Sequence, residues 1–267
     1  PKKFYSLILF LFSFKKFKKE INKPKTSYLY SKNLDKINDK EYKITSQNNE
    51  DGIIEYIFSN ISNNKFFIEI GFDYFECNTL NLIKKGWNGI LIEADEEKCL
   101  RIEKCINHFF PNNKIEIINS KIDKDNINSF TKNQKIDFFS IDIDGNDYWV
   151  LEKLQKENIS IICSEYNPWI GNKNFKTIPY DKNFLYMNDY YFGASLNAYT
   201  DLLKTKFDLI GIDSSGTNAF YINNNISHNF EILIPEKSFK EATKFHSESE
   251  QEIIKDYIKK KKFFNLK

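Results

Sequence analysis

Three aspartates, Asp142, Asp144 and Asp147, close the apolar stretch FFSIDIDGND around one glycine, Gly145. Carboxylates in this arrangement can accept a proton, attack as nucleophiles or hold a cation. The stretch is typical of a phosphatase nucleophile loop, of a calcium loop, or of the carboxyl edge of a nucleotide-binding α/β sheet. The spacing of the residues and the elements around them discriminate among the three.

A calcium loop of the EF-hand type carries glycine at its sixth position and a bidentate glutamate at its twelfth. If Gly145 is the sixth residue, the twelfth is Leu151. Leucine offers no ligand oxygen in its side chain, so a calcium loop of this type is excluded.

The stretch also resembles the nucleophile loop of haloacid-dehalogenase-like phosphatases, in which Asp-x-Asp-Gly follows an apolar strand. In that interpretation Asp142 would form an aspartyl-phosphate, Asp144 would act as acid and base, and Ser164 could hold the phosphoryl group. Asn146 stands where a threonine is usual, and Asp213 is followed by SSGTN rather than by a second acidic residue. These departures count against the phosphatase interpretation, which remains an alternative.

The elements that position these aspartates follow from a rhythm of short apolar runs separated by helical patterns. Runs that are nearly continuous in apolar side chains are typical of parallel strands covered on both faces. The runs are residues 65–70, 89–93, 114–118, 136–142 and 159–165. Strand and helix in alternation predict right-handed crossovers and a doubly wound parallel sheet.

The pattern changes after the fifth run. Residues 195–206 predict a helix with Ser195 as its N-cap, and residues 207–213 and 218–223 are two further strands. The SSGT segment between these two strands predicts a hairpin. We therefore expect five parallel strands closed by a C-terminal hairpin.

The loop after the first strand is the place to look for a ligand, because ligands of open α/β sheets lie beyond the carboxyl ends of the strands. Glu69 ends the strand, Gly71 makes the turn, and Asn78 or Thr79 begins the helix. Asp73 stands where a dinucleotide fingerprint has its second glycine, and a carboxylate there would repel a pyrophosphate. Glu69 and Asp73 instead suit a ligand with an amine and a sulfonium.

Two further strand ends complete this half of the site. Glu93 ends the second strand, 22 positions after Gly71, which suits an acidic residue that binds the ribose hydroxyls of an adenosine. Asn119 and Ser120 follow the third strand, where an adenine edge could be met.

Together these blocks resemble the class I S-adenosylmethionine-dependent methyltransferases and, within them, the FkbM-type family. The resemblance spans roughly residues 51–225 and is carried by FFIEIGFDYFECNTLNLIKKGWNGILIEAD, IDFFSIDIDGNDYWVLEKL, ISIICSEYNPWIG, YFGASLNAYTDLL and GIDSSGTNAFYIN. It implies a Rossmann-like, seven-stranded sheet in three α/β/α layers. It also implies S-adenosyl-L-methionine bound over Glu69 to Asp73 and Glu93, and methyl transfer to a hydroxyl, often on a sugar or polyketide.

Under this resemblance the stretch around Gly145 is the edge of the fourth strand. Asp142 and Asp144 then point into the cofactor and acceptor crevice, and Asp147 stabilises the start of the next helix. The fifth strand brings Glu165, Tyr166 and Asn167 to the same crevice.

Methyl transfer to a hydroxyl often needs a base, and none of the three histidines falls at a carboxyl edge. We expect Glu165 or Asp144 to be the base and Asn167 to orient the acceptor. Asp142 and Asp144 could also hold a divalent cation with Glu165, although the sequence alone assigns no metal ligand.

Residues 169–193 form a long aromatic connection after the fifth strand. Connections of this length in compact domains are often functional, and tyrosines suit stacking on a sugar ring. We expect this loop to line the acceptor pocket, and plain hydrophobic cover is the alternative.

The composition fits one α/β domain with extensions. We expect an N-terminal helix and polar arm over residues 1–50, a Rossmann domain over 51–230 and a helical extension over 231–267.

The net charge is +2, the lysines are spread along the chain, and Arg101 is the only arginine, so nucleic-acid binding is not favoured. Cys77, Cys99, Cys105 and Cys163 form no C-x-x-C pair and are expected to be buried free thiols of a cytoplasmic protein.

The apolar run over residues 4–14 is flanked by lysines and is too short to span a membrane. It could lie on a membrane surface or pack on its own domain, or belong to a truncated signal or anchor. Peripheral membrane association is therefore one expectation for it.

The sequence thus supports two leading hypotheses. The first is an S-adenosylmethionine-dependent methyltransferase that acts on a glycan or small-molecule hydroxyl. The second is a non-catalytic binding module with the same fold.

Overall fold

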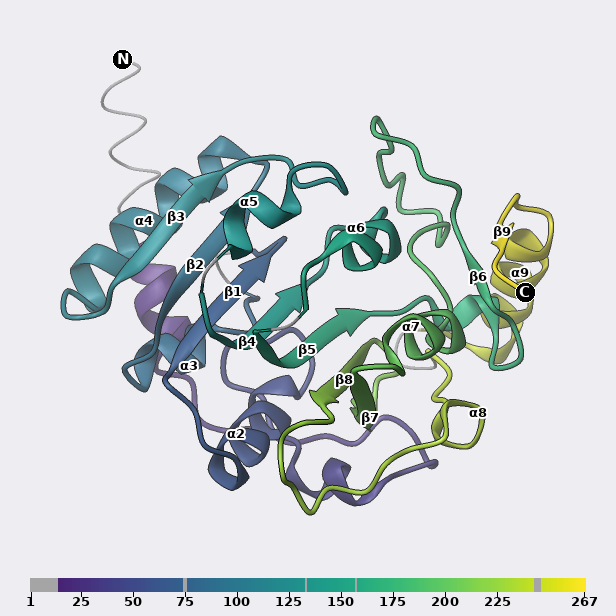
Figure 1. The fold of residues 1–267 in the computed structure, drawn as a ribbon, viewed down its shortest axis with the longest axis horizontal. Coiled ribbons are helices and arrows are strands. Elements are labelled where there is room, and N and C mark those ends of the chain that lie inside the picture. The colour runs from purple at the N-terminus through teal and green to yellow at the C-terminus, as the bar shows by residue number, and fades with distance from the viewer. Residues whose placement is uncertain (1–13, 74–75, 133, 157, 243–245) are drawn as a thin grey trace.

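The computed structural model describes residues 14–73, 76–132, 134–156, 158–242 and 246–267. A seven-stranded sheet in the order β3-β2-β1-β4-β5-β8-β7 crosses the domain (Figure 1). Its strands are β1 (Phe66–Ile70), β2 (Asn88–Glu93), β3 (Ile115–Asn119), β4 (Ile136–Ile141), β5 (Ile159–Glu165), β7 (Phe207–Ile212) and β8 (Asn218–Asn223). The first five strands run parallel, and β8 is antiparallel to both β5 and β7.

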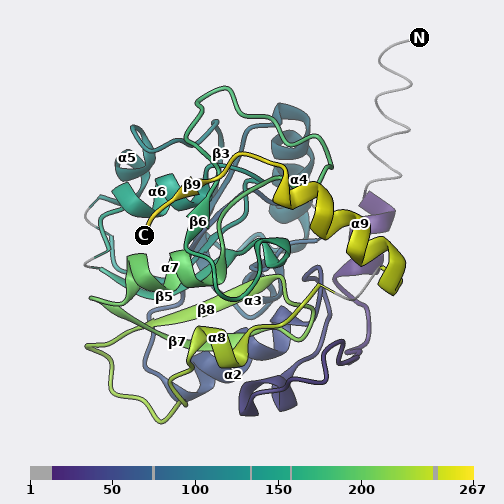
Figure 2. The same cartoon turned by 90° about the vertical axis from the view of Figure 1, so that its right-hand side faces the viewer.

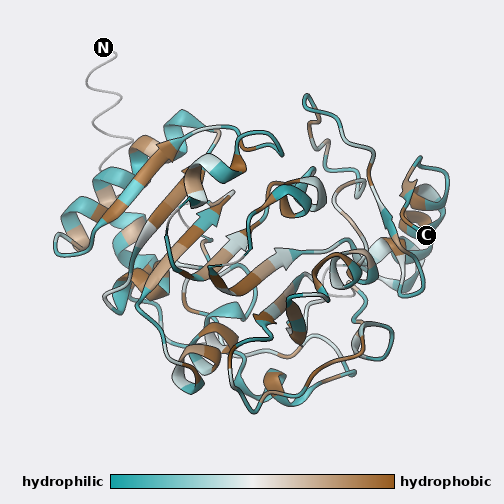
Figure 3. Ribbon diagram, in the orientation of Figure 1, coloured by the Kyte–Doolittle hydropathy of each residue, from teal (hydrophilic) through white to brown (hydrophobic). Residues whose placement is uncertain are grey.

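Helices cover both faces of the sheet, which gives three layers. One face packs against α2 (Glu50–Asn60), α3 (Leu80–Lys84) and α4 (Glu96–Phe109), and the other against α5 (Ile127–Thr131), α6 (Asp147–Lys153) and α7 (Leu196–Leu203). Successive strand residues face opposite layers, so Phe138 lies in the first core and Phe139 in the second. Figure 3 shows the strands as largely hydrophobic and the helices as two-sided.

Further elements lie outside these layers. They are the 3₁₀ helices η1 (Lys36–Lys40) and η2 (Pro168–Ile170), the helices α8 (Pro235–Ser238) and α9 (Glu248–Lys259), and the strands β6 (Lys176–Thr177) and β9 (Phe264–Asn265). Figure 2 shows the C-terminal segment running beside β6, and β6 and β9 pair antiparallel. The sequence did not predict this pair, because strands of two residues have no detectable periodicity.

The predicted α/β fold is confirmed, including the C-terminal hairpin of β7 and β8. Ser195 is the N-cap of α7, as expected, and its hydroxyl accepts a hydrogen bond from the backbone N–H of Ala198 (3.3 Å). The helix ends at Leu203, slightly before the expected boundary. Strand order reverses between β1 and β4, which is where α/β sheets bind ligands.

The polar arm before α2 packs closely against the domain. Asp51 accepts hydrogen bonds from the backbone N–H groups of Ile44 (2.7 Å), Thr45 (2.7 Å) and Ser46 (2.9 Å). The Cys77 backbone N–H, in the loop after β1, donates to the Thr45 carbonyl (3.0 Å). The arm is therefore attached to the same loop that the sequence places at the cofactor.

Other expectations concern the thiols and the apolar run. Cys77, Cys99, Cys105 and Cys163 are free and buried, as predicted. Residues 4–13 of the apolar run lie outside the described part of the chain. Its last residue, Phe14, packs against Phe109 with 4.8 Å between ring centroids. Among the described residues, no helix is long and apolar enough to cross a membrane.

Candidate active site at the carboxyl edge of the sheet

A cavity of about 450 Å³ lies at the carboxyl ends of the central strands. The loops after β1, β2, β3 and β4 line it, together with residues 184–186, Gln47 and Asn218. Most of the residues expected from the sequence line this one cavity: Glu69, Gly71, Asp73, Asn78, Glu93, Ser120, Asp142 and Asp144. Two others, Glu165 and Asn167, are not among its lining residues.

Gly71 makes the turn after β1 with a φ of +74°, in the left-handed region that favours glycine. Its backbone N–H donates to the Ile92 carbonyl on β2 (3.0 Å), and the carbonyl of Asp142 on β4 lies on its other side. A Cβ at this position would lie 1.6 Å from that carbonyl oxygen. Only glycine therefore fits between β2 and β4 at this point.

Glu69 is buried and holds the loop after β1 in place. Its carboxylate accepts hydrogen bonds from the backbone N–H groups of Asn78 (2.9 Å) and Thr79 (3.1 Å), from the Thr79 hydroxyl, and from the Cys77 thiol (2.9 Å). Burial raises the pKa of Glu69, and these donors oppose the rise. Asp73 is more open to solvent and lies 3.8 Å from the Lys98 ammonium.

Glu93, at the end of β2, binds backbone groups of the loops that follow β1 and β2. Its carboxylate accepts from the backbone N–H groups of Phe72 (3.3 Å) and Asp95 (2.9 Å). A carboxylate has about four acceptor positions, so these two bonds leave room for a diol ligand. Ser120 lies beside Glu93, because the Ser120 backbone N–H donates a hydrogen bond to the Glu93 backbone carbonyl (3.0 Å).

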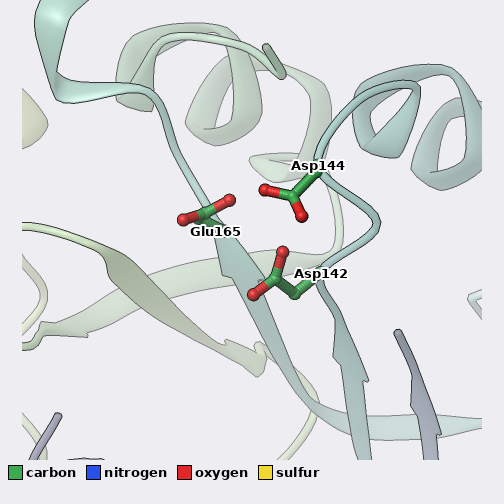
Figure 4. Close-up of side chains that lie close together, drawn as sticks. All are labelled: Asp142, Asp144 and Glu165. Atoms are coloured by element: carbon green, nitrogen blue, oxygen red, sulfur yellow. The ribbon is translucent and has the colours of Figure 1, made fainter. Parts of the chain in front are cut away.

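Asp142, Asp144 and Glu165 form a cluster in which one carboxylate oxygen from each lies within 4.8 Å of the others. Figure 4 shows the three side chains pointing toward one another from the ends of β4 and β5. The register explains the approach, because Ile141 on β4 pairs with Ser164 on β5, and the next residues are Asp142 and Glu165. A φ of +53° at Asp144 turns the chain back toward the cluster.

The cluster holds protons more tightly than free carboxyl groups do. Burial, followed by the neighbouring carboxylates, raises the pKa values of Asp142 and Glu165 well above their usual range, and the two side chains are hydrogen-bonded to each other. Protonation of either carboxyl group would relieve the repulsion between the two. Burial also raises the pKa of Asp144, while Lys98 opposes the rise.

The same three carboxylates could hold a divalent cation. Mg²⁺ bound at about 2.1 Å places opposite ligand oxygens about 4.2 Å apart, and Ca²⁺ places them slightly farther apart. The spacing within the cluster fits either ion after a small adjustment. A cation bound there would favour the ionised forms of Asp142 and Glu165.

Asp147 has the structural role expected for it. It is the first residue of α6, and its carboxylate accepts from the backbone N–H groups of Ile143 and Gly145 (both 2.9 Å). Burial raises the pKa of Asp147 to about 6. Asp147 therefore fixes the turn that presents Asp144.

Asn167 does not face the cavity, contrary to the sequence-based expectation. Its side-chain N–H₂ donates to the carbonyls of Tyr190 (2.9 Å) and Phe192 (3.0 Å), and its oxygen accepts from the Trp169 backbone N–H (3.0 Å). Tyr166 is fully buried and donates to the Lys240 carbonyl (3.0 Å). Both residues therefore hold segments around the site, because the loop folds back over the end of β5.

The long connection reaches the cavity as expected, through Phe184, Leu185 and Tyr186. The C-terminal helix α9 and the segment after it hold it from outside, because Asp189 accepts from the Tyr257 hydroxyl of α9 (2.6 Å) and pairs with the Lys261 ammonium beyond it (2.9 Å). The aromatic residues of the connection are thus placed at the cavity by contacts that lie far away in the sequence.

Sequence reasoning missed Gln47 and Asn218. Asn218 begins β8 opposite Glu165, and its side-chain N–H₂ donates to Glu50 (2.8 Å). Asn218 was recognised only as a strand residue, and Gln47 lies in a polar segment that resembles a linker. The antiparallel pairing of β8 was a usable signal for Asn218, since it brings the start of β8 to the carboxyl edge. No signal identified Gln47.

Glu50 supports this side of the cavity from a fully buried position. Burial, and then the charge of Asp213, raise its pKa to about 7. Its carboxylate also accepts from the Asn48 backbone N–H (2.7 Å) and side chain (2.9 Å).

The raised pKa of Glu50 predicts a pH dependence of stability. The folded protein holds this proton up to about pH 7, whereas the unfolded chain releases it near pH 4.5. The contribution of Glu50 to the free energy of unfolding is therefore present below pH 4.5 and is lost as the pH rises to about 7. The loss is about 3 kcal/mol.

We expect the Glu50→Gln variant to lose this part of the pH dependence in urea unfolding curves measured across that range. The matched control is Glu248→Gln at the exposed start of α9, which should keep the profile of the unaltered protein. Parallel profiles for Glu50→Gln and the unaltered protein would contradict the prediction.

No protein-family model and no curated protein sequence matches the chain. Solved structures similar to it include the N-terminal domain of EvdMO1 with S-adenosylhomocysteine bound (12% identity, 67% of this chain and 82% of that chain, TM-score 0.45). A second is an S-adenosylmethionine-dependent methyltransferase from Clostridium acetobutylicum (13% identity, 65% of this chain and 90% of that chain, TM-score 0.43). A third is magnesium protoporphyrin IX methyltransferase from Synechocystis, also with S-adenosylhomocysteine bound (10% identity, 66% of this chain and 81% of that chain, TM-score 0.44). Likenesses of this size say nothing of the reaction, so the functional assignment rests on the site.

Proposed function

We propose that the protein is an S-adenosyl-L-methionine-dependent methyltransferase that acts on a hydroxyl of a sugar, a glycan or a related small molecule. The observation that carries the proposal is the position of the cluster of Asp142, Asp144 and Glu165 at the rim of an acidic cavity over β1 and β2. One half of the site suits a cationic nucleoside, and the other half suits removal of a proton from an acceptor.

The charge of the cavity supports this choice of ligand. Its lining carries many more carboxylates than ammonium groups: Glu69, Asp73, Glu76, Glu93, Asp142 and Asp144 against Lys98 and Lys121. Acidic walls attract the sulfonium and ammonium of the cofactor and repel phosphates. The same charge disfavours nucleic acids and phosphate esters as ligands.

The arrangement of strand ends gives the cofactor a direction. Glu93 would bind the ribose hydroxyls and Ser120 would lie near the adenine, with Gly71 under the methionine part. The cluster of Asp142, Asp144 and Glu165 would then lie on the side of the transferred methyl group. An acceptor hydroxyl held by the cluster could meet that group for in-line displacement.

Asp144 is the group best placed to take the acceptor proton. It lines the cavity and is exposed, whereas Glu165 does not line the cavity and Asp142 is hydrogen-bonded to Glu165. Solvent reaches Asp144 from the cavity, but the protein around its carboxyl group still desolvates it and raises its pKa, so Asp144 holds a proton taken from the acceptor more readily than an aspartate of ordinary pKa would. Phe184 and Tyr186 offer rings against which a sugar could pack.

The phosphatase alternative fits the site less well. Ser164, which it needs beside the phosphoryl group, is fully buried and does not line the cavity. The acidic lining would also repel a phosphate ester.

Substitution of Glu93 by alanine tests the cofactor half of the site. We expect the affinity for S-adenosylhomocysteine in calorimetry to fall at least about 10-fold, because a carboxylate that binds a diol is lost. Glu96→Ala, at the exposed start of α4, is the control and should bind like the unaltered protein. Absence of binding to the intact protein would reject the proposed function itself.

The binding-module hypothesis differs from the methyltransferase in one measurable outcome. If S-adenosylhomocysteine binds but no labelled methyl group moves from S-adenosylmethionine to any glycan or small-molecule fraction, the protein is a binding module. The sequence resemblance to the FkbM-type family makes sugars the first acceptors to test.

A further inference from the structure

The arm before α2 places one side chain into the cavity. Gln47 is exposed and lines the cavity, whereas the residues on either side of it, Ser46 and Asn48, are buried. Within residues 44–50, Gln47 is thus the one residue that is not buried.

The backbone around Gln47 is held from both sides. On one side, the Asp51 carboxylate accepts from the backbone N–H groups of the three residues that precede Gln47. On the other side, the Asn48 backbone N–H donates to Glu50 (2.7 Å). The Lys43 ammonium donates to the Gln47 carbonyl (2.6 Å). Gln47 is therefore presented from a fixed backbone.

Four amide side chains line the cavity, and they differ in what they bind. Asn78 donates to the Ser140 hydroxyl (3.2 Å), Asn146 to the Asp181 carbonyl (2.7 Å) and Asn218 to Glu50 (2.8 Å). The side chain of Gln47 has no hydrogen-bond partner in the described part of the chain. Each of the three asparagines thus uses one of its two side-chain N–H groups within the protein, whereas both N–H groups of Gln47 are available to a ligand.

Gln47 lies at the end of the cavity away from Glu93. The Thr45 carbonyl accepts from Cys77 in the loop after β1, and Glu50 binds Asn218 at the start of β8. In the sheet, β8 lies on the opposite side of β1 from β2. Lys121, the exposed lysine of the lining, follows β3 and lies at the other end.

We propose that Gln47 binds the carboxylate of the methionine part of S-adenosylmethionine through its side-chain N–H₂. The inference rests on the proposed function, because it assumes that the adenosine lies at Glu93. The methionine carboxylate is the one anionic group of the cofactor and meets a largely acidic wall, so it needs a donor. Gln47 supplies that donor and thereby positions the sulfonium.

The test is calorimetry on the full chain with two ligands, S-adenosylhomocysteine and 5′-methylthioadenosine, which lacks the amino-acid part. Gln47→Ala should weaken S-adenosylhomocysteine binding about 10-fold and leave methylthioadenosine binding within about 2-fold. Gln47→Glu should weaken S-adenosylhomocysteine binding further, and Gln47→Arg should restore it. Gln155→Ala, an exposed glutamine outside the cavity, is the matched control.

Unchanged S-adenosylhomocysteine affinity in Gln47→Ala would overturn the assignment. An equal loss for both ligands would also overturn it, because it would indicate a disturbed pocket rather than a lost carboxylate contact. If the unaltered protein binds neither ligand, the proposed function fails, which is a distinct result.

Discussion

Gly71→Ala is expected to destabilise the fold by about 3 kcal/mol or more and to abolish binding of S-adenosylhomocysteine. The new Cβ would lie 1.6 Å from the Asp142 carbonyl oxygen and 2.7 Å from its carbon, and both are backbone atoms that cannot move alone. Relief of the clash requires β1 and β4 to separate at the point where the cofactor is expected to bind. Urea unfolding curves and calorimetry measure the two effects.

Gly86 provides a matched control. Its φ of +83° is also in the left-handed region, but a Cβ there would have no atom within 4 Å. Gly86→Ala should therefore cost only about 1 kcal/mol, from backbone strain alone. Similar costs at Gly71 and Gly86 would show that the close approach of β4 is unimportant.

Asp144→Asn is expected to reduce methyl transfer at least about 100-fold, because asparagine cannot take the acceptor proton. Binding of S-adenosylhomocysteine should stay within about 2-fold, since its sulfur carries no charge for Asp144 to stabilise. The assay follows a labelled methyl group from S-adenosylmethionine to whichever acceptor fraction the intact protein labels.

The pH profile gives a second measurement for Asp144. Burial raises the pKa of Asp144, so transfer should increase as the pH rises through that raised value and the group loses its proton. Asp144→Asn should remove this rise, whereas Asp39→Asn, at an exposed aspartate of η1, should keep both rate and profile. Full activity in Asp144→Asn would leave the base to the pair of Asp142 and Glu165.

Much of the site could be predicted because of a simple geometric rule. Carboxyl ends of parallel strands meet at one edge of a sheet, so residues that end successive apolar runs become neighbours. Glu69, Glu93, Ser120 and Asp142 are brought to one cavity for this reason. Glycine at position 71 was likewise recognisable, because a tight turn after a strand favours a positive φ.

The rule failed where a side chain's surroundings come from distant segments. Asn167 ends up inside the protein because the connection after β5 folds back and offers it the carbonyls of Tyr190 and Phe192. Glu69 was expected to meet the cofactor with a free charge, but its own loop surrounds it with donors. Strand position predicts the edge a residue reaches and does not predict what covers it.

Local patterns in the chain thus specify the order of strands and helices, the turn at Gly71 and the set of carboxylates at the sheet edge, because these depend on periodicity and on neighbours in sequence. Long-range packing specifies the roles within that set. It pairs Asp142 with Glu165 through strand register, exposes Asp144 beside them, and brings Gln47 to the cavity from a segment that resembles a linker. Those contacts depend on how distant segments pack together, and no periodicity in the sequence encodes them.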